Sequence, residues 1–119
     1  MTSATTVLFV YGTLKRGLGN HHLLAGQEFL GEAETEPRYR VIDLRRYPGL
    51  ILDEANGLAV KGELWNVTAT CIEALDDFEE AAGLFVRKPV RIPGRGLVHA
   101  YFWNCTLPSN ARSGDRWPL

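Results

Sequence analysis

An apolar segment that ends in a glycine is the first place where residue types and spacing could support chemistry. Residues Val7 to Tyr11 (VLFVY) combine β-branched and aromatic types, which predicts a strand, and Gly12 and Thr13 follow it. Where a strand stops, backbone N–H groups lose their ladder partners, and a glycine lets a ligand approach them closely. Converging amides of this kind can form an oxyanion pocket. The alternative interpretation is an ordinary turn after a buried strand.

A glutamate among apolar residues is the second such place. In a helix that turns by about 100° per residue, Glu79 lies seven residues after Ile72 and four after Leu75, inside an apolar stripe. Loss of water there would raise the pKa of the carboxyl, which suits general acid–base catalysis at neutral pH. The alternative is structural, since Glu79 could reach water at the helix end or pair with Arg87. The other acids of this segment predict a solvated face: Glu73, Asp76, Asp77 and Glu80.

Other residue types that often act in catalysis form no recognisable pattern. His21 and His22 lack a third ligand at a metal-site spacing, so we expect them at the surface or at a helix start. His99 alternates with apolar residues in a predicted strand and is expected to be a packed or surface imidazole. Cys71 and Cys105 form no Cys-x-x-Cys motif, and we expect two reduced, partly buried thiols. No serine-hydrolase elbow or P-loop is present in the sequence, so neither chemistry is predicted.

Several short strands and one helix must position these residues. The helix is predicted over Thr70 to Ala82, with Thr70 and Glu73 as a capping box and Gly83 as its end. The strands are expected over Val7 to Tyr11, Arg38 to Leu44, Leu50 to Leu52, Ala59 to Val67, Leu84 to Ile92 and Leu97 to Trp103. This content predicts the α+β class, in a small barrel-like domain.

Spacing also predicts the core and the connections. Alternation places six apolar side chains inside the barrel with the helix packed across them: Leu8, Val10, Val60, Leu64, Val86 and Val90. Tyr47-Pro48-Gly49 and Asn56-Gly57 are typical of turns, and Pro89 in mid-strand predicts an edge strand or a bulge. The tail from Pro108 to Leu119 is expected to be draped over the domain or partly disordered.

Length and charge restrict the class of protein. The 119 residues predict a single domain over residues 1–119, with 45% hydrophobic and 23% charged residues. A net charge of −1 gives no reason to expect binding to nucleic acid or to an anionic membrane. No apolar run approaches the roughly 20 residues of a membrane span, and no secretion signal is visible. We therefore expect a cytoplasmic protein, as a monomer or weak dimer.

With these features described, the chain resembles the gamma-glutamylcyclotransferase-like family, especially its gamma-glutamylamine cyclotransferase branch. The resemblance rests on four pieces in family order and covers nearly the whole chain, to about Trp103. They are FVYGTLKRG at 9–17 with Asn20-His21 behind it, Tyr47-Pro48-Gly49, VKGELW at 60–65, and LDDFEEAAGLFVR at 75–87.

The resemblance implies a small mixed β-barrel with flanking helices, and a reaction that needs no metal and no cofactor. The substrate would be a small γ-glutamyl amide, which is converted to 5-oxoproline and a free amine when its α-amine attacks the side-chain carbonyl. By resemblance, Glu79 is the general acid–base. The backbone of Tyr11, Gly12, Thr13 and Leu14 would hold the glutamyl group, and Phe85 stands in the substrate pocket where family members often carry tyrosine.

Two other functions fit the same residues. One is a non-catalytic small-molecule binder on the same barrel, which the retained Glu79 disfavours. The other is a pathway-specific enzyme that removes a γ-glutamyl protecting group from a biosynthetic intermediate. The sequence does not separate this enzyme from one of general amine salvage.

Overall fold

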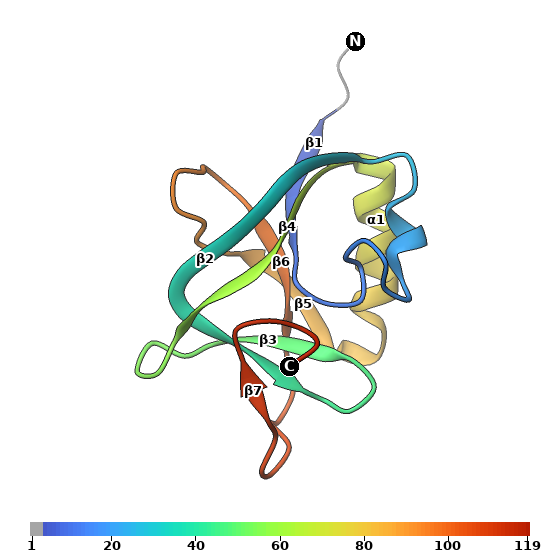
Figure 1. Ribbon diagram of the computed structural model, residues 1–119. Coiled ribbons are helices and arrows are strands. Elements are labelled where there is room, and N and C mark those ends of the chain that lie inside the picture. The colour runs from blue at the N-terminus through green and yellow to red at the C-terminus, as the bar shows by residue number, and fades with distance from the viewer. Residues whose placement is uncertain (1–3) are drawn as a thin grey trace.

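Five strands close into a barrel in the computed structural model, which describes residues 4–119 (Figure 1). The strands are β1 (Thr5–Val10), β2 (Glu28–Asp43), β3 (Pro48–Leu52), β4 (Leu58–Thr68), β5 (Phe85–Pro89), β6 (His99–Trp103) and β7 (Ser113–Gly114). The order β1-β4-β2-β3-β6 closes on itself because β6 pairs in parallel with β1, with Leu8 opposite His99. This confirms the predicted α+β barrel.

Two further strands extend this ring. Strand β5 pairs only with β6 among the described residues and forms the edge that Pro89 predicted. The antiparallel pairing of β5 and β6 confirms that the two predicted strands are neighbours, although both are shorter than expected. Strand β7 pairs with the second half of β2. The site described below lies beside the ring, where β1 ends.

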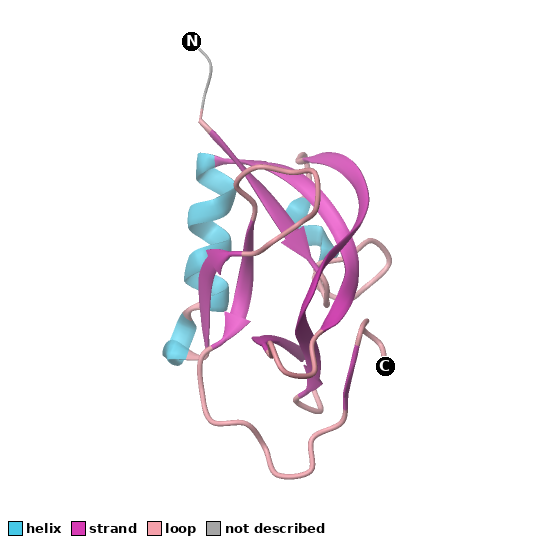
Figure 2. Cartoon of the chain, turned by 90° about the vertical axis from the view of Figure 1, so that its left-hand side faces the viewer, coloured by secondary structure: helices cyan, strands magenta, loops and turns pink. Residues whose placement is uncertain are grey.

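One α-helix and two short 3₁₀ helices flank the barrel, with the α-helix running alongside it (Figure 2). Helix α1 spans Ala69–Glu79, the 3₁₀ helix η1 spans His21–Leu24, and η2 spans Ala81–Gly83. The predicted capping box is wrong, because Thr68 is the N-cap and its side chain accepts a hydrogen bond from the Cys71 N–H at 3.2 Å. The predicted end at Ala82 is also wrong, because Ala82 has a φ of 59° and cannot continue a right-handed helix.

The sequence predicted less than half of β2. The first part of this strand carries four glutamates and Pro37, and its apolar alternation is too weak to indicate a strand. Long pairing with β4 forms it instead, with a register shift just before Gly31 and others on both sides of Pro37. Gly31 has a φ of 132°, which glycine adopts without strain at such an irregularity. Tertiary pairing overrides weak local preference here.

The core is divided between the barrel interior and the space under α1. Phe9 and Tyr11 face the interior, together with the predicted residues Val60, Leu64, Val86 and Val90. Leu8 and Val10 are buried as well, but they pack against the helix with Leu75. The prediction that Leu8 and Val10 lie inside the barrel is therefore wrong. Both faces of β1 are covered, so alternation alone does not distinguish the inner face from the outer.

The turn before β3 lies earlier than predicted. Leu44 N–H donates to the Tyr47 carbonyl at 3.1 Å, and Arg45 adopts a φ of 79° within this turn. Pro48 and Gly49 already belong to β3. This connection matters for function because it places Tyr47 and Pro48 opposite the end of β1.

The C-terminal tail is ordered against the barrel. Strand β7 holds its middle, Lys61 pairs with Asp115 at 3.0 Å, and Trp117 packs against the barrel core. These contacts place the tail against the barrel, as the draped alternative for this segment had it. Within residues 4–119, no helix combines the length and apolar character needed to cross a membrane.

Candidate active site

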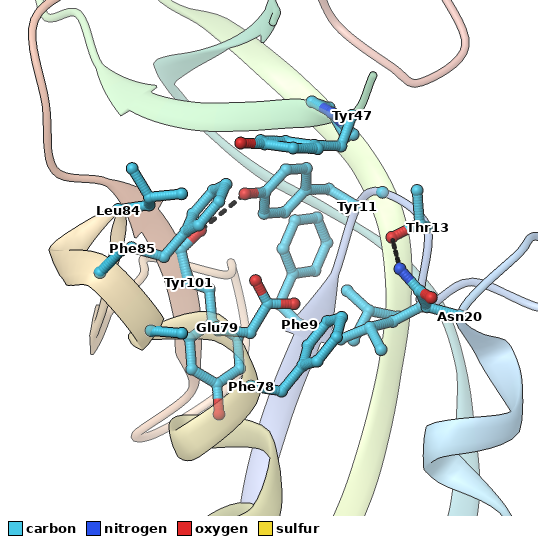
Figure 3. Close-up of a pocket in the computed structure, with 16 residues that line it drawn as sticks. Phe9, Tyr11, Thr13, Asn20, Tyr47, Phe78, Glu79, Leu84, Phe85 and Tyr101 are labelled. Carbon is cyan, nitrogen blue, oxygen red and sulfur yellow. Dashed lines mark hydrogen bonds between the residues drawn. The ribbon is translucent and has the colours of Figure 1, made fainter.

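A cavity of about 260 Å³ lies where the end of β1, the end of α1, η2 and the start of β3 and β5 meet (Figure 3). The sequence-predicted site residues all line it: Tyr11, Gly12, Thr13, Leu14, Glu79 and Phe85. Ligand pockets in proteins usually have volumes of about 300–1,000 Å³, and this cavity lies just below that range, so it has room for a small molecule. The fold thus brings together two features that are more than sixty residues apart in the sequence.

The loop after β1 is held by its own backbone and by Asn20. The Asn20 side chain donates to the Thr13 hydroxyl at 2.9 Å, and the Asn20 N–H donates to the Thr13 carbonyl at the same distance. His21 contacts the Leu14 carbonyl through Nδ1 at 3.0 Å, which ties η1 to this loop. His21 therefore lies at a helix start, which was one of the two positions expected for it.

Three backbone donors in this loop are free. Among residues 4–119, no acceptor takes a hydrogen bond from the N–H groups of Gly12, Thr13 or Leu14. All three residues line the cavity. Free amides beside a cavity can stabilise a carboxylate or a developing oxyanion, as the strand-end pattern predicted.

The Tyr11 side chain is structural. Its hydroxyl donates to the Tyr101 carbonyl at 2.7 Å and accepts from the Leu50 N–H at 3.1 Å. Burial raises the pKa of Tyr11 far above its usual value, and the Glu79 carboxylate raises it further. Tyr11 therefore stays neutral and joins β1, β3 and β6 at the wall of the cavity.

Glu79 is the last residue of α1, and its carboxylate points into the cavity (Figure 3). Burial raises the pKa of Glu79 from 4.5 to about 7. In the part of the chain that the structure describes, no cation pairs with this carboxylate, and Arg87 is bound elsewhere. The structural alternative of a Glu79–Arg87 pair is thus wrong. A carboxyl whose pKa lies near neutral pH can both accept and donate a proton.

Arg87 pairs instead with Asp76, one turn before Glu79. Its Nε and Nη2 donate to the two Asp76 oxygens at 2.8 and 3.0 Å, and the Tyr101 hydroxyl donates to Asp76 at 2.7 Å. Arg87 also donates to Nδ1 of His99. Burial alone would raise the pKa of Asp76, but the hydrogen bonds from Arg87 and Tyr101 outweigh it and hold that pKa below its usual value.

This cluster corrects one sequence-based expectation and agrees with another. Asp76 is not part of a solvated acidic face, because it is half-buried and bound to β5 and β6. His99 is packed, which was one of the two positions expected for it. Burial, together with the charge of Arg87, lowers the pKa of His99. The cluster fastens the end of α1 to the barrel and so fixes where Glu79 enters the cavity.

We expect Asp76→Asn to lower the free energy of unfolding by about 1–2 kcal/mol. Each partner of the Asp76–Arg87 pair is 24% exposed, so the loss should fall between that of a surface and a fully buried pair. Because the pKa of Asp76 is lowered, its contribution is complete above pH 3.8 and is lost as the pH falls through the folded-state pKa. Urea unfolding at pH 7 measures the effect, and Asp77→Asn at the exposed neighbour is the matched control. Equal stability of the two variants would show that the cluster does not hold α1.

The wall opposite the loop is aromatic and aliphatic. Phe85 is 8% exposed and packs edge-on against Trp103, with ring centroids 5.4 Å apart, and against Tyr47 at 5.8 Å. Phe78 is 50% exposed and also lines the cavity. Sequence reasoning missed Tyr47, Phe78 and Asn20 as cavity residues, although Asn20 follows the strand-end motif closely enough to have been a candidate.

The two cysteines are free thiols. Cys71 is half-buried under η1, with its Sγ 3.6 Å from the Leu23 carbonyl, and burial raises its pKa. Cys105 is exposed, so the expectation of two partly buried thiols holds for Cys71 alone. Neither lines the cavity.

Comparison with known proteins identifies the family that the chain resembles. A family model described as "Gamma-glutamyl cyclotransferase, AIG2-like" matches residues 8–118. A relative from Vibrio cholerae named "Putative gamma-glutamylcyclotransferase" is 34% identical over 110 residues, which cover 92% of this chain and 93% of that protein. The gamma-glutamylaminecyclotransferase of Homo sapiens is 35% identical over 96 residues, 72% of this chain and 61% of the human protein.

A solved structure gives the same fold. The crystal structure of an aig2-like protein from Mus musculus superposes with a TM-score of 0.84 at 24% identity, and the match covers 95% of this chain and 88% of that one. The sequence matches span less than two thirds of several curated relatives, including the human one, so those proteins contain segments without a counterpart in the matched region.

Proposed function

The chain belongs to the gamma-glutamyl cyclotransferase, AIG2-like family, and we propose that it converts a γ-glutamyl amine into 5-oxoproline and the free amine. The observation that carries this proposal is the Glu79 carboxylate, which has no counter-ion among residues 4–119 and a pKa of about 7. It faces a cavity that is also lined by the free backbone N–H groups of Gly12, Thr13 and Leu14. A proton carrier and an oxyanion site beside one small cavity are what an intramolecular acyl transfer requires.

In the first step, Glu79 as the carboxylate takes one proton from the α-ammonium of the substrate. The freed amine attacks the side-chain carbonyl carbon, and a C–N bond closes the five-membered ring. The carbonyl oxygen becomes an oxyanion, which the N–H groups of the Gly12–Leu14 loop stabilise. The cavity favours this step because it holds the substrate folded, with the two reacting groups in contact.

In the second step, Glu79 as the neutral acid gives its proton to the leaving nitrogen, and the original amide C–N bond breaks. Of the three protons on the substrate ammonium, one stays on the lactam nitrogen and two end on the released ammonium. Glu79 can carry these two in turn and is a carboxylate again at the end. The reaction as written needs no redox or metal-dependent step.

The direct test is release of 5-oxoproline from a synthetic γ-glutamyl alkylamide, with the product measured by chromatography. We expect time-dependent formation of 5-oxoproline and free amine in equal amounts. Binding of the amide without product would contradict the enzyme proposal and favour a non-catalytic binder. The identity of the released amine decides whether the protein acts in general amine salvage or removes a γ-glutamyl protecting group in one pathway.

The pH dependence should follow Glu79. The carboxylate is the form that starts the reaction, and its pKa is about 7, so kcat/KM should fall about tenfold for each pH unit below that value. With an ordinary glutamate in this role, kcat/KM would not change until the pH fell to about 5. Initial rates from pH 5 to 8 at low substrate concentration measure this profile. A flat profile across that range would show that the group with a pKa near 7 is not required.

A further inference from the structure

We infer that Lys15 is a positioning residue for the proposed reaction, because it ties the loop that carries the free N–H groups to the C-terminal tail. This inference rests on the proposed function and adds to it a residue outside the active cavity. The Lys15 ammonium donates a hydrogen bond to the carbonyl of Trp117, which lies 102 residues later in the chain. Figure 1 shows both segments, with the loop after β1 in blue and the tail in red. We call residues 12–15 the donor loop.

Lys15 belongs to the backbone of the donor loop but not to the active cavity. Its N–H donates to the Gly12 carbonyl at 3.1 Å, which closes a turn around the two residues between them, and its carbonyl accepts from the Leu18 N–H at 3.1 Å. The other three residues of the loop line the active cavity, whereas Lys15 lines a second cavity of about 500 Å³ together with Arg116 of the tail. A displacement of Lys15 therefore moves the three donor N–H groups, although its side chain does not reach the substrate.

The tail can hold the Trp117 carbonyl in place because it is anchored just before this residue. Strand β7 pairs with β2, and Lys61 then binds Asp115 twice. The Lys61 N–H donates to the Asp115 carbonyl at 2.8 Å, and the Lys61 ammonium lies 3.0 Å from the Asp115 carboxylate. Two residues further on, the Trp117 side chain packs against the barrel core. The acceptor of the Lys15 hydrogen bond is thus part of the ordered barrel.

No carboxylate competes with the Trp117 carbonyl for the Lys15 ammonium. Among residues 4–119, no carboxylate oxygen lies within 4.0 Å of Lys15 Nζ. Glu63 lines the same second cavity, but it already accepts from the Arg16 N–H and guanidinium, both at 3.1 Å, and from the Trp65 indole at 3.2 Å. A hydrogen bond from a charged donor is roughly twice as strong as a neutral one. The bond to Trp117 is therefore what restrains the Lys15 side chain.

The first test removes the donor. Lys15→Met keeps the length of the side chain and deletes its three N–H groups. A loop shift of about 1 Å can cost about a hundredfold in rate. Because Arg16 still holds the next residue to Glu63, we expect kcat/KM for a γ-glutamyl alkylamide to fall by a smaller factor, about tenfold. The Kd of 5-oxoproline, measured by calorimetry, should rise by a similar factor. Lys15→Arg retains a charged donor and should recover most of both.

Two readouts separate positioning from other roles of Lys15. If the lysine only stabilised the fold, Lys15→Met would lower the melting temperature but leave kcat/KM and the Kd of 5-oxoproline unchanged well below that temperature. If its charge acted on Glu79, the midpoint of the pH profile would move. We expect this midpoint to stay at about 7.

The second test removes the support of the acceptor. Trp117→Ala deletes the ring that holds the Trp117 carbonyl and should also lower kcat/KM about tenfold, whereas Trp117→Phe should lose less. Both Lys15→Met and Trp117→Ala break the same contact, so the double variant should be little worse than either single variant. Arg116→Ala is the control in the tail, because Arg116 is exposed and pairs with Asp115. It should leave kcat/KM unchanged.

The outcomes distinguish this inference from the proposed function. Lys15→Met with unchanged kcat/KM and product affinity would overturn the positioning role and leave the cyclotransferase proposal in place. Effects of Lys15→Met and Trp117→Ala that multiply in the double variant would show that the two residues act separately, which also contradicts the inference. If the unmodified protein releases no 5-oxoproline from any γ-glutamyl amide, the proposed function fails and this inference fails with it.

Discussion

Glu79→Gln should lower the turnover of a γ-glutamyl amide by about two to four orders of magnitude. Glutamine has nearly the same shape and can still occupy the cavity wall at the end of α1. It can neither take the proton of the α-ammonium nor return a proton to the leaving nitrogen. Binding should survive, because the loop amides of Gly12–Leu14 are unchanged. Steady-state rates together with calorimetric binding of the amide measure both effects.

Glu73→Gln is the matched control, because it makes the same chemical change on the exposed part of the same helix. Its turnover should stay close to that of the unmodified protein. If the two variants behave alike, or if Glu79→Gln keeps most of its rate, the catalytic role of Glu79 is wrong. The non-catalytic binder would then be the better interpretation.

The free energy of unfolding provides an independent readout for Glu79→Gln. Glu79 has a pKa of 4.5 when unfolded and about 7 when folded, so the folded state keeps a proton that the unfolded state has already lost in this range. The carboxylate therefore costs stability as the pH rises from 4.5 to 7. Glutamine removes this cost, and Glu79→Gln should raise the free energy of unfolding by about 1–3 kcal/mol at pH 8, with no gain near pH 4. A loss of stability at pH 8 would contradict the burial assigned to this carboxyl.

Gly12→Ala should damage both folding and activity. A Cβ at this position would lie 2.5 Å from Cγ of Pro48, which is buried at the start of β3. The proline ring is rigid and its strand is paired with β2, so the loop after β1 must move instead. Overpacking of this kind costs about 1–3 kcal/mol. A shift of about 1 Å in the loop that holds the substrate would lower turnover about a hundredfold.

Gly19→Ala is the control in the same loop region, because a Cβ there would meet no atom within 4 Å. Its stability and rate should change little. Urea unfolding and 5-oxoproline release measure the pair of variants. Equal behaviour of Gly12→Ala and Gly19→Ala would show that contact between the loop and β3 does not shape the cavity.

Local spacing alone was enough to predict the two halves of the candidate site. The run from Val7 to Tyr11 ends at Gly12 because β-branched and aromatic residues favour a strand and glycine interrupts it. The helical period places Glu79 among apolar residues without any knowledge of what covers them. Both inferences need only a few neighbouring residues, and the structure places both segments at one cavity.

Features that depend on two distant segments were not predictable in this way. Periodicity shows that both faces of β1 are apolar, but closure of the barrel by β6 decides that Phe9 faces inward and Leu8 faces α1. Likewise, the sequence allows Arg87 to pair with Glu79 or with Asp76, and the packing of β5 against α1 selects Asp76.

Short-range patterns were therefore sufficient to predict the strand that ends before Gly12, the helix that carries Glu79 and the family of the chain. Each of these depends on residues close together in the sequence or on a motif of fixed order. The tertiary structure alone decided that Glu79 has no cationic partner among the described residues, that Tyr47 and Phe78 complete the cavity, and that the tail packs on the barrel. The physical reason is that counter-ions, cavity walls and docking contacts arise between segments whose separation is fixed only when the barrel closes.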